Sequence, residues 1–270
     1  MNSPPMTTTL PKIQPSENFV SQDSIVREIW GKGDTILFIF AGAAAEFALN
    51  KAVDWLYFTG RLPADPLGRL FSTVSYARTI VFAKEAAALK AIDSMAAIHA
   101  VVEEKRGKRI PDWAYRDVLF MLIDYSIRAY EVLERPLAEA ERREVFDVFH
   151  RVGSRMGVRG LPATYPEWIA MRHDHLQSNL QWSTYTHDLY RQYYKHLGMV
   201  RYFLLREAQT LIVPERVRSL LEFRRFSLLR PVLGIYKWSR ALGLDRVMKA
   251  LILPGEYKRE IADLDRVPIS

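Results

Sequence analysis

The chain of 270 residues contains no cysteine. Disulfides, thiolate metal sites and cysteine nucleophiles are therefore excluded. Targeting signals are then the remaining guide to location, and the N-terminal stretch MNSPPMTTTLPKIQPSENF lacks a basic start followed by an apolar run, so it is not a secretory signal. Its Pro, Ser and Thr content predicts a disordered tail over residues 1–22.

Long hydrophobic runs are also lacking. The best candidate, TILFIFAGAAAEFAL at residues 35–49, is interrupted by Glu46 and followed closely by Lys51 and Asp54. A membrane span needs roughly 20 apolar residues, so the run predicts a buried core helix. We expect a cytoplasmic protein or one bound peripherally to a membrane.

Strand patterns, internal repeats, Gly-rich nucleotide turns, phosphate loops and Ser-His-Asp arrangements are absent as well. Apolar residues recur instead with helical spacing, which predicts an all-α fold. One helical domain is expected over residues 23–213, with a basic helical extension over 214–270. The predicted helices span residues 24–32, 34–58, 66–82, 85–105, 112–134, 138–156, 166–181 and 184–212.

Positive charge is concentrated near the C-terminus. The chain carries a net charge of +7, and residues 214–260 contain 11 Lys or Arg against 5 Asp or Glu, a net +6. No nucleic-acid-binding motif accompanies this charge, so no nucleic-acid partner is expected. Two interpretations of the extension stay open: a solvated helical face packed on the domain, or a basic amphipathic surface at a membrane.

Two polar residues stand out on the helix predicted over 66–82. Arg69 and Thr73 are four residues apart and share one face, where a guanidinium among apolar residues needs a polar partner. If this helix forms a hairpin with the next one, Arg69 and His99 both lie roughly 21–23 Å from the turn, at about 1.5 Å per residue. The hairpin would thus place Arg69, Thr73 and His99 close together.

His99 has two interpretations. It lies on the apolar stripe formed with Leu89, Ile92 and Ala96, where a buried histidine with one satisfied hydrogen bond is the commoner case. Beside a guanidinium and a hydroxyl, however, it suits a haem that performs dioxygen chemistry, with histidine as the axial ligand. Phe82 and Met95 are the apolar neighbours expected to contact the porphyrin.

The other histidines carry weaker signals. Asp147 and His150 have the spacing used in di-iron bundles, but a second copy of the pattern is missing. The HDH stretch at 173–175 favours a solvated face. His187 and His196 lie among tyrosines, which favours packing.

Four segments together resemble a known family. They are DPLGRLFSTVSYARTIVF, IHAVVEEKRG, PDWAYRDVLFMLIDYSIRAYE and RVGSRMGVRGLPATYPEW, and in this order they resemble the MpaB-like oxygenase and rubber oxygenase family from about residue 24 to about residue 220. The resemblance implies an all-α domain. Its rubber oxygenases bind haem b and use dioxygen to cleave carbon–carbon double bonds.

The resemblance also implies roles for individual residues. His99 would be the proximal haem ligand, Arg69 and Thr73 would lie in the distal pocket, and Asp54 would be an acidic residue able to act as a base. Ser72 stands where rubber oxygenases can carry a lysine that caps the distal side of the iron, so an uncapped sixth site is expected.

The expected function is therefore a haem b-dependent oxygenase of a hydrophobic small molecule, unsaturated or prenylated, with dioxygen as co-substrate. Two alternatives stay open. One is a haem-binding or sensing protein without turnover, and the other is a metal-free helical binding protein at the periphery of a membrane.

Overall fold

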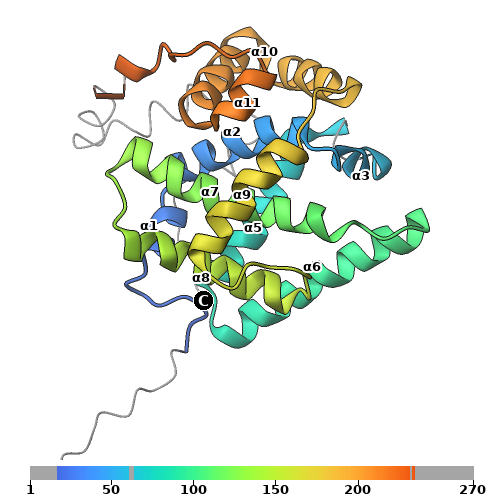
Figure 1. Ribbon diagram of the computed structural model, residues 1–270, viewed down its shortest axis with the longest axis vertical. Helices are drawn as coiled ribbons and strands as arrows, with labels where there is room; N and C mark the ends of the chain where they lie inside the picture. The colour runs from blue at the N-terminus through green and yellow to red at the C-terminus, as the bar shows by residue number, and fades with distance from the viewer. Residues whose placement is uncertain (1–16, 61–63, 232, 235–270) are drawn as a thin grey trace, which may run out of the picture.

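The computed structural model describes residues 17–60, 64–231 and 233–234, without the side chains of residues 66, 67 and 69–71. Throughout these ranges the regular elements are helices and no β-strand forms, so the predicted all-α class is confirmed. Figure 1 shows their arrangement. The helices are α1 (Ile25–Trp30), α2 (Gly33–Leu49), α3 (Val53–Phe58), α5 (Pro66–Phe82), α6 (Glu85–Arg106), α7 (Asp112–Leu133), α8 (Glu139–Arg155), α9 (Tyr165–Ser178), α10 (Thr184–Ile212) and α11 (Glu215–Leu220).

Helix α2 lies at the centre of the fold and packs between α7 and α10. It comes from the apolar run at 35–49, and it is the buried core helix that the sequence predicts. Gly42 permits the close approach to α7, because a Cβ atom at this position would lie 2.3 Å from the ring of Tyr125. The core is therefore built around a helix with a small residue at its tightest contact.

The helix predicted over 34–58 is broken at Asn50. The backbone of Asn50 is extended (φ −68°, ψ 133°). The side-chain oxygen of Asn50 accepts a hydrogen bond of 2.8 Å from the backbone N–H of Ala52. The side-chain amide of Asn50 also donates to Asp117 of α7, at 2.8 Å. These bonds end α2 at Leu49 and start α3 at Val53.

Both ends of the described chain pack onto the helices. Phe19 and Val20 are only 3% and 2% exposed. The backbone N–H of Phe19 donates to the carbonyl of Ala83, so the predicted disordered tail is wrong for residues 17–22. Residues 1–16 lie outside the described residues, as does most of the extension predicted over 214–270; its described part, α11 and the residues after it, packs on the domain.

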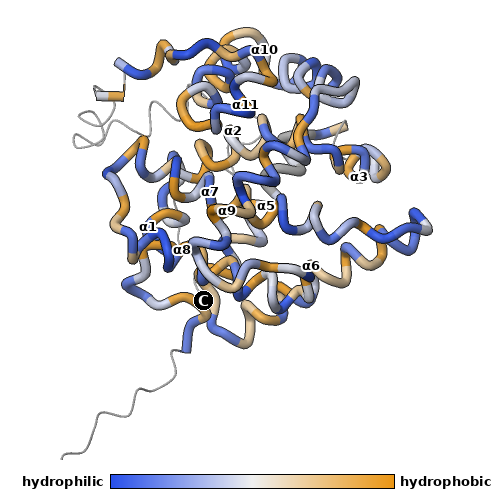
Figure 2. The backbone as a smooth tube through the Cα atoms, in the orientation of Figure 1, coloured by the Kyte–Doolittle hydropathy of each residue, from blue (hydrophilic) through white to orange (hydrophobic). Residues whose placement is uncertain are grey.

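Helices α5 and α6 pack against each other around the turn at Ala83, as predicted, whereas the predicted proximity of Arg69 and Thr73 to His99 stays a prediction. Asp65 caps α5 by accepting a hydrogen bond from the N–H of Gly68, Pro66 begins the helix, and the chain turns at Ala83. Of the residues in α6, only Ala88 and Ile92 are buried. Figure 1 shows the outer half of α6 running away from the body, and Figure 2 shows hydrophobic stretches recurring along it.

Candidate functional site

His99 lies on the outer half of α6 and is half-buried. Its Nδ1 is 2.8 Å from the backbone carbonyl oxygen of Met95, one turn earlier. Its ring lies 5.3 Å from the ring of Tyr115 on α7, at an interplanar angle of 74°. The imidazole is thus oriented by its own helix and covered by an aromatic edge from the next.

A carboxylate ties the outer half of α6 to α7. Glu103 Oε1 accepts hydrogen bonds from the Tyr115 hydroxyl at 3.1 Å and from the backbone N–H of Ile110 at 2.9 Å. Burial, and then the charge of Glu103, raises the pKa of Tyr115 above its ordinary value, so this phenol stays protonated and donates. The contact that positions the Tyr115 ring against His99 is therefore maintained by a charged acceptor.

Asp54 lies on α3 and is paired with the end of α6. Its Oδ2 accepts from Arg106 Nη2 at 2.6 Å. The Arg106 guanidinium also lies over the ring of Trp55, 3.9 Å from its centroid. Together with Trp55, buried Ala52 and Ala114 form a small second core that joins α3, α6 and α7.

The structure brings together only part of the predicted site. Thr73 is half-buried on α5, and Arg69 is helical there, but the Arg69 side chain lies outside the described residues. Met95 lies one turn before His99 on α6, and its contact with a porphyrin stays a prediction. Phe82 is a core residue at the hairpin turn, 5% exposed and stacked under Arg27, about 20 Å along α6 from His99 at 1.5 Å per residue. One cofactor cannot reach both, so Phe82 is left out of the candidate site.

The surroundings of His99 fit a haem. A ligating histidine usually bonds a carbonyl or carboxylate through one ring nitrogen, and Nδ1 of His99 has such a bond with the Met95 carbonyl. Across the described part of the chain, no three histidine, aspartate or glutamate side chains gather as a metal site. A porphyrin brings its own equatorial nitrogens, so a single histidine suffices for haem iron.

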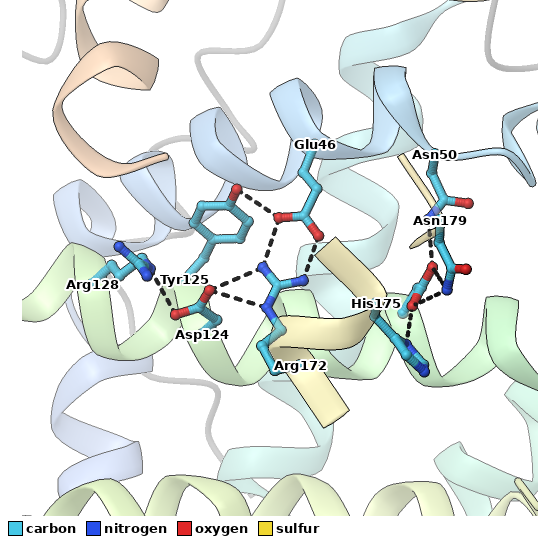
Figure 3. A network of polar contacts seen from close by, with 9 residues as sticks. Glu46, Asn50, Asp124, Tyr125, Arg128, Arg172, His175 and Asn179 are labelled. Carbon is cyan, nitrogen blue, oxygen red and sulfur yellow. Dashed lines mark hydrogen bonds and ion pairs between the residues drawn. The ribbon is translucent and has the colours of Figure 1, made fainter. Parts of the chain in front are cut away.

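A polar network inside the core is the feature that sequence reasoning missed. Arg172 of α9 donates to Glu46 of α2 at 2.6 Å and to Asp124 of α7 at 2.9 Å, and all three are at least 93% buried. The Tyr125 hydroxyl donates to Glu46 at 2.9 Å, and Arg128 donates to Asp124 at 2.7 Å. Figure 3 shows the guanidinium of Arg172 between the two carboxylates.

The charges of this network stabilise one another. Burial alone would raise the pKa of Asp124, but the guanidiniums of Arg128 and Arg172 outweigh it and lower that pKa below its ordinary value. The two carboxylates likewise outweigh the effect of burial on Arg172 and raise its pKa well above the usual range. The network therefore joins α2, α7 and α9 as ions rather than as neutral groups.

A second buried cluster lies beside the first. Asp117 of α7 accepts hydrogen bonds from the side chains of Asn50, Asn179 and His175. The solvated face predicted for the HDH stretch is therefore wrong for His175, whose ring also lies 5.2 Å from that of Phe120. Both clusters join core helices through hydrogen bonds between mostly buried side chains.

Residues 29–243, which are well over half of the chain, match the family described as ER-bound oxygenase mpaB/B'/rubber oxygenase, catalytic domain. The chain belongs to this family. No curated protein and no solved structure gave a significant match. The predicted family is thus confirmed, and the protein contains an oxygenase catalytic domain.

The match places the hairpin of α5 and α6 inside the mpaB/rubber oxygenase domain, together with Asp54, His99 and Tyr115. It also covers the buried networks around Arg172 and Asp117. None of the helices in the described ranges has the length and apolar character needed to cross a membrane.

Proposed function

We propose that this mpaB/rubber oxygenase domain is a haem b-dependent oxygenase. Its substrate is a hydrophobic small molecule, unsaturated or prenylated, which it cleaves oxidatively at a carbon–carbon double bond with dioxygen. The orientation of His99 by the Met95 carbonyl is the observation that carries the proposal, and the family match supports the oxygenase chemistry.

The geometry around His99 supports the proposed roles of its neighbours. His99 would hold the iron, while the Met95 carbonyl orients the imidazole and the Tyr115 ring limits its rotation. The exposed apolar side chain of Ile98 (46%), next to His99 on α6, would be covered by a cofactor or an apolar substrate. When bound, haem supplies the centre at which dioxygen is activated.

The remaining roles are assigned to residues of α5 and α3. Arg69 and Thr73 donate hydrogen bonds to the oxygen reactant and orient it. Asp54 takes up a proton from the substrate, and Arg106 holds its carboxylate in place at 2.6 Å. Water exclusion by the apolar side chains would strengthen each of these polar contacts.

The visible absorption spectrum of the purified protein after reconstitution with haem tests the proposal. The wild type is expected to show a Soret band, and His99→Ala is expected to lose it or shift it because the axial ligand is gone. His173→Ala, a histidine on α9, is the matched control and keeps the wild-type spectrum. A colourless folded protein, or an unchanged spectrum for His99→Ala, would contradict the haem assignment.

Dioxygen consumption by the haem-loaded protein tests turnover. Polyprenyl and alkene substrates are expected to stimulate it, and Asp54→Asn should lower the rate while leaving the Soret band unchanged. A haem-loaded protein that consumes no dioxygen with any of these substrates would instead indicate a sensing protein, the alternative that shares His99.

A further inference from the structure

Helix α10 is a hairpin of two arms that fold back at Gly198. Gly198 has φ 70° and ψ 173°, a conformation open essentially only to glycine. Residues at equal distances before and after it meet: the ring of Tyr194 is 5.4 Å from that of Tyr202, and the Arg206 guanidinium lies 5.9 Å from the Tyr190 ring. The residues directly after Gly198 therefore lie at the bend of this hairpin, which we call its tip, and Figure 1 shows α10 at one end of the molecule.

The tip exposes large apolar side chains. Met199 is 70% exposed, Val200 is 66% exposed, and Phe203 on the next turn is 46% exposed. In the loop after α11, Phe226 is 60% exposed and Leu228 is 56% exposed. A soluble surface rarely presents so many neighbouring apolar side chains without a partner.

One buried carboxylate joins the loop to the second arm. Glu207, 3% exposed, accepts hydrogen bonds from the Ser227 hydroxyl at 2.9 Å and the Leu228 N–H at 2.6 Å, and it pairs with Arg224. Glu207 lies about 10 Å along the helix from Val200, at 1.5 Å per residue. We group the tip and the loop as the α10 face (residues 199–203 and 224–230), because Glu207 binds the loop about two turns after Val200 on the same arm.

The region around the α10 face is strongly basic. Residues 182–230 contain nine Lys or Arg and four Asp or Glu, a net charge of +5. Three of the four acidic residues are already paired with arginines, in Asp188–Arg191, Glu207–Arg224 and Glu215–Arg218. On the face itself, Arg225 and Arg230 are exposed. Apolar side chains surrounded by cations are typical of a surface that binds anionic lipids.

A cavity of about 430 Å³ opens beside this face. It is lined by aromatic rings, among them Trp182, Tyr194 and Tyr202, and by the guanidinium of Arg206. Arg206 lies over Phe223 at 4.8 Å and has no ion pair with any carboxylate in the described part of the chain. A partly buried guanidinium in an aromatic cavity is suited to a lipid phosphate.

We propose that the α10 face docks the protein on an anionic lipid membrane, with Met199, Val200 and Phe226 inserted among the lipids. The charge of the α10 face favours an anionic membrane over the C-terminal segment of this chain and over a second copy of the chain. Residues 235–270 carry seven basic and five acidic side chains, a net +2, and a second copy of the chain carries +7, so neither is complementary to a basic surface. This proposal is independent of the oxygenase function, because it concerns a separate surface.

Co-sedimentation with vesicles tests the docking. Wild-type protein is expected to bind vesicles made of equal parts phosphatidylserine and phosphatidylcholine, to bind pure phosphatidylcholine weakly, and to dissociate as salt is raised. The double variant Met199→Ser/Val200→Ser should bind about tenfold more weakly, because two apolar side chains no longer enter the membrane. Arg225→Ala/Arg230→Ala should lose about fivefold per arginine.

Matched controls lie elsewhere on the surface. Ile169→Ser removes an apolar side chain that is 50% exposed on α9, and Arg159→Ala removes an exposed charge; both should bind like the wild type. Circular dichroism checks that every variant is folded, and an unchanged haem spectrum separates this test from that of the oxygenase function.

Three outcomes would overturn the proposal. Wild-type protein that fails to bind the anionic vesicles excludes membrane docking. A wild-type dimer that the tip variant converts to monomer in light scattering assigns the face to self-association. Binding that is lost on Lys237→Ala/Lys249→Ala but kept by both face variants assigns docking to the C-terminal segment instead.

Discussion

Arg172 is a guanidinium buried to 5% exposure that joins three helices. A buried charge is costly unless it is paired, and here two carboxylates accept from it. Arg172→Met keeps much of the volume but leaves Glu46 and Asp124 without their shared partner. We expect the free energy of unfolding in urea to fall by about 3–5 kcal/mol.

The control for this variant is an exposed pair of the same chemistry. Arg143 pairs with Glu139 on α8, and their side chains are 55% and 69% exposed. Arg143→Met should cost less than about 1 kcal/mol, because water already screens the charges. Equal losses for the two variants would show that the buried network has no special importance for stability.

The sequence indicates that Glu46 needs a buried partner, but it does not indicate which residue that partner is. Glu46 interrupts an apolar run, and a carboxylate at such a position needs a partner when the helix is buried. Its partner Arg172 is 126 residues away, so only the tertiary fold brings the two together. His99 differs, because the carbonyl that orients it belongs to Met95, four residues earlier on the same helix. A contact this local can be expected from the sequence alone.

At the scale of the element, helix α6 is held to the rest of the fold partly by contacts at its C-terminal end. Only two residues of this helix are buried, so the site around His99 depends on the contact of Arg106 with Asp54 and Trp55. Arg106→Ala removes both the ion pair and the cation–π contact. We expect amide hydrogen exchange over residues 95–106 to become about tenfold faster, from a loss of about 1–2 kcal/mol at a partly exposed site.

Arg155→Ala is the comparison, because Arg155 of α8 pairs with Asp93 of α6 through side chains that are about half exposed. It should leave exchange over residues 95–106 nearly unchanged. Faster exchange in the buried parts of α7 after Arg106→Ala would contradict a local role for the pair.

Helix boundaries show the same division between local and distant causes. Those of α5 follow from Asp65, Pro66 and the turn at Ala83, which are local signals. The break at Asn50 also depends on Asp117, 67 residues away, and was not predicted. Phe19 and Val20 look like part of a polar tail, but they pack in the core beside the turn between α5 and α6.

At the scale of the whole molecule, the ionised core makes stability depend on pH. The pKa of Asp124 is lower in the folded protein than its ordinary value of about 3.9, so the unfolded chain binds its proton more readily. Its contribution is therefore complete above about pH 4 to 5 and is lost as pH falls through the folded-state pKa. On the surface, Glu141 adds to this trend, because Arg135 and the N–H of Ala138 lower its pKa to about 2.

The urea midpoint should accordingly stay nearly constant between about pH 7 and 5 and fall steeply below about pH 4. Asp124→Asn cannot be protonated, so it should be less stable at neutral pH yet lose less on acidification, and the two curves should converge at low pH. Glu141→Gln serves as a surface comparison and should remove only a small part of the fall, because solvent screens that pair. Parallel curves for the wild type and Asp124→Asn would show that acid acts elsewhere, and a converging pair would show that the three-helix ionic junction limits the acid stability of the fold that positions His99.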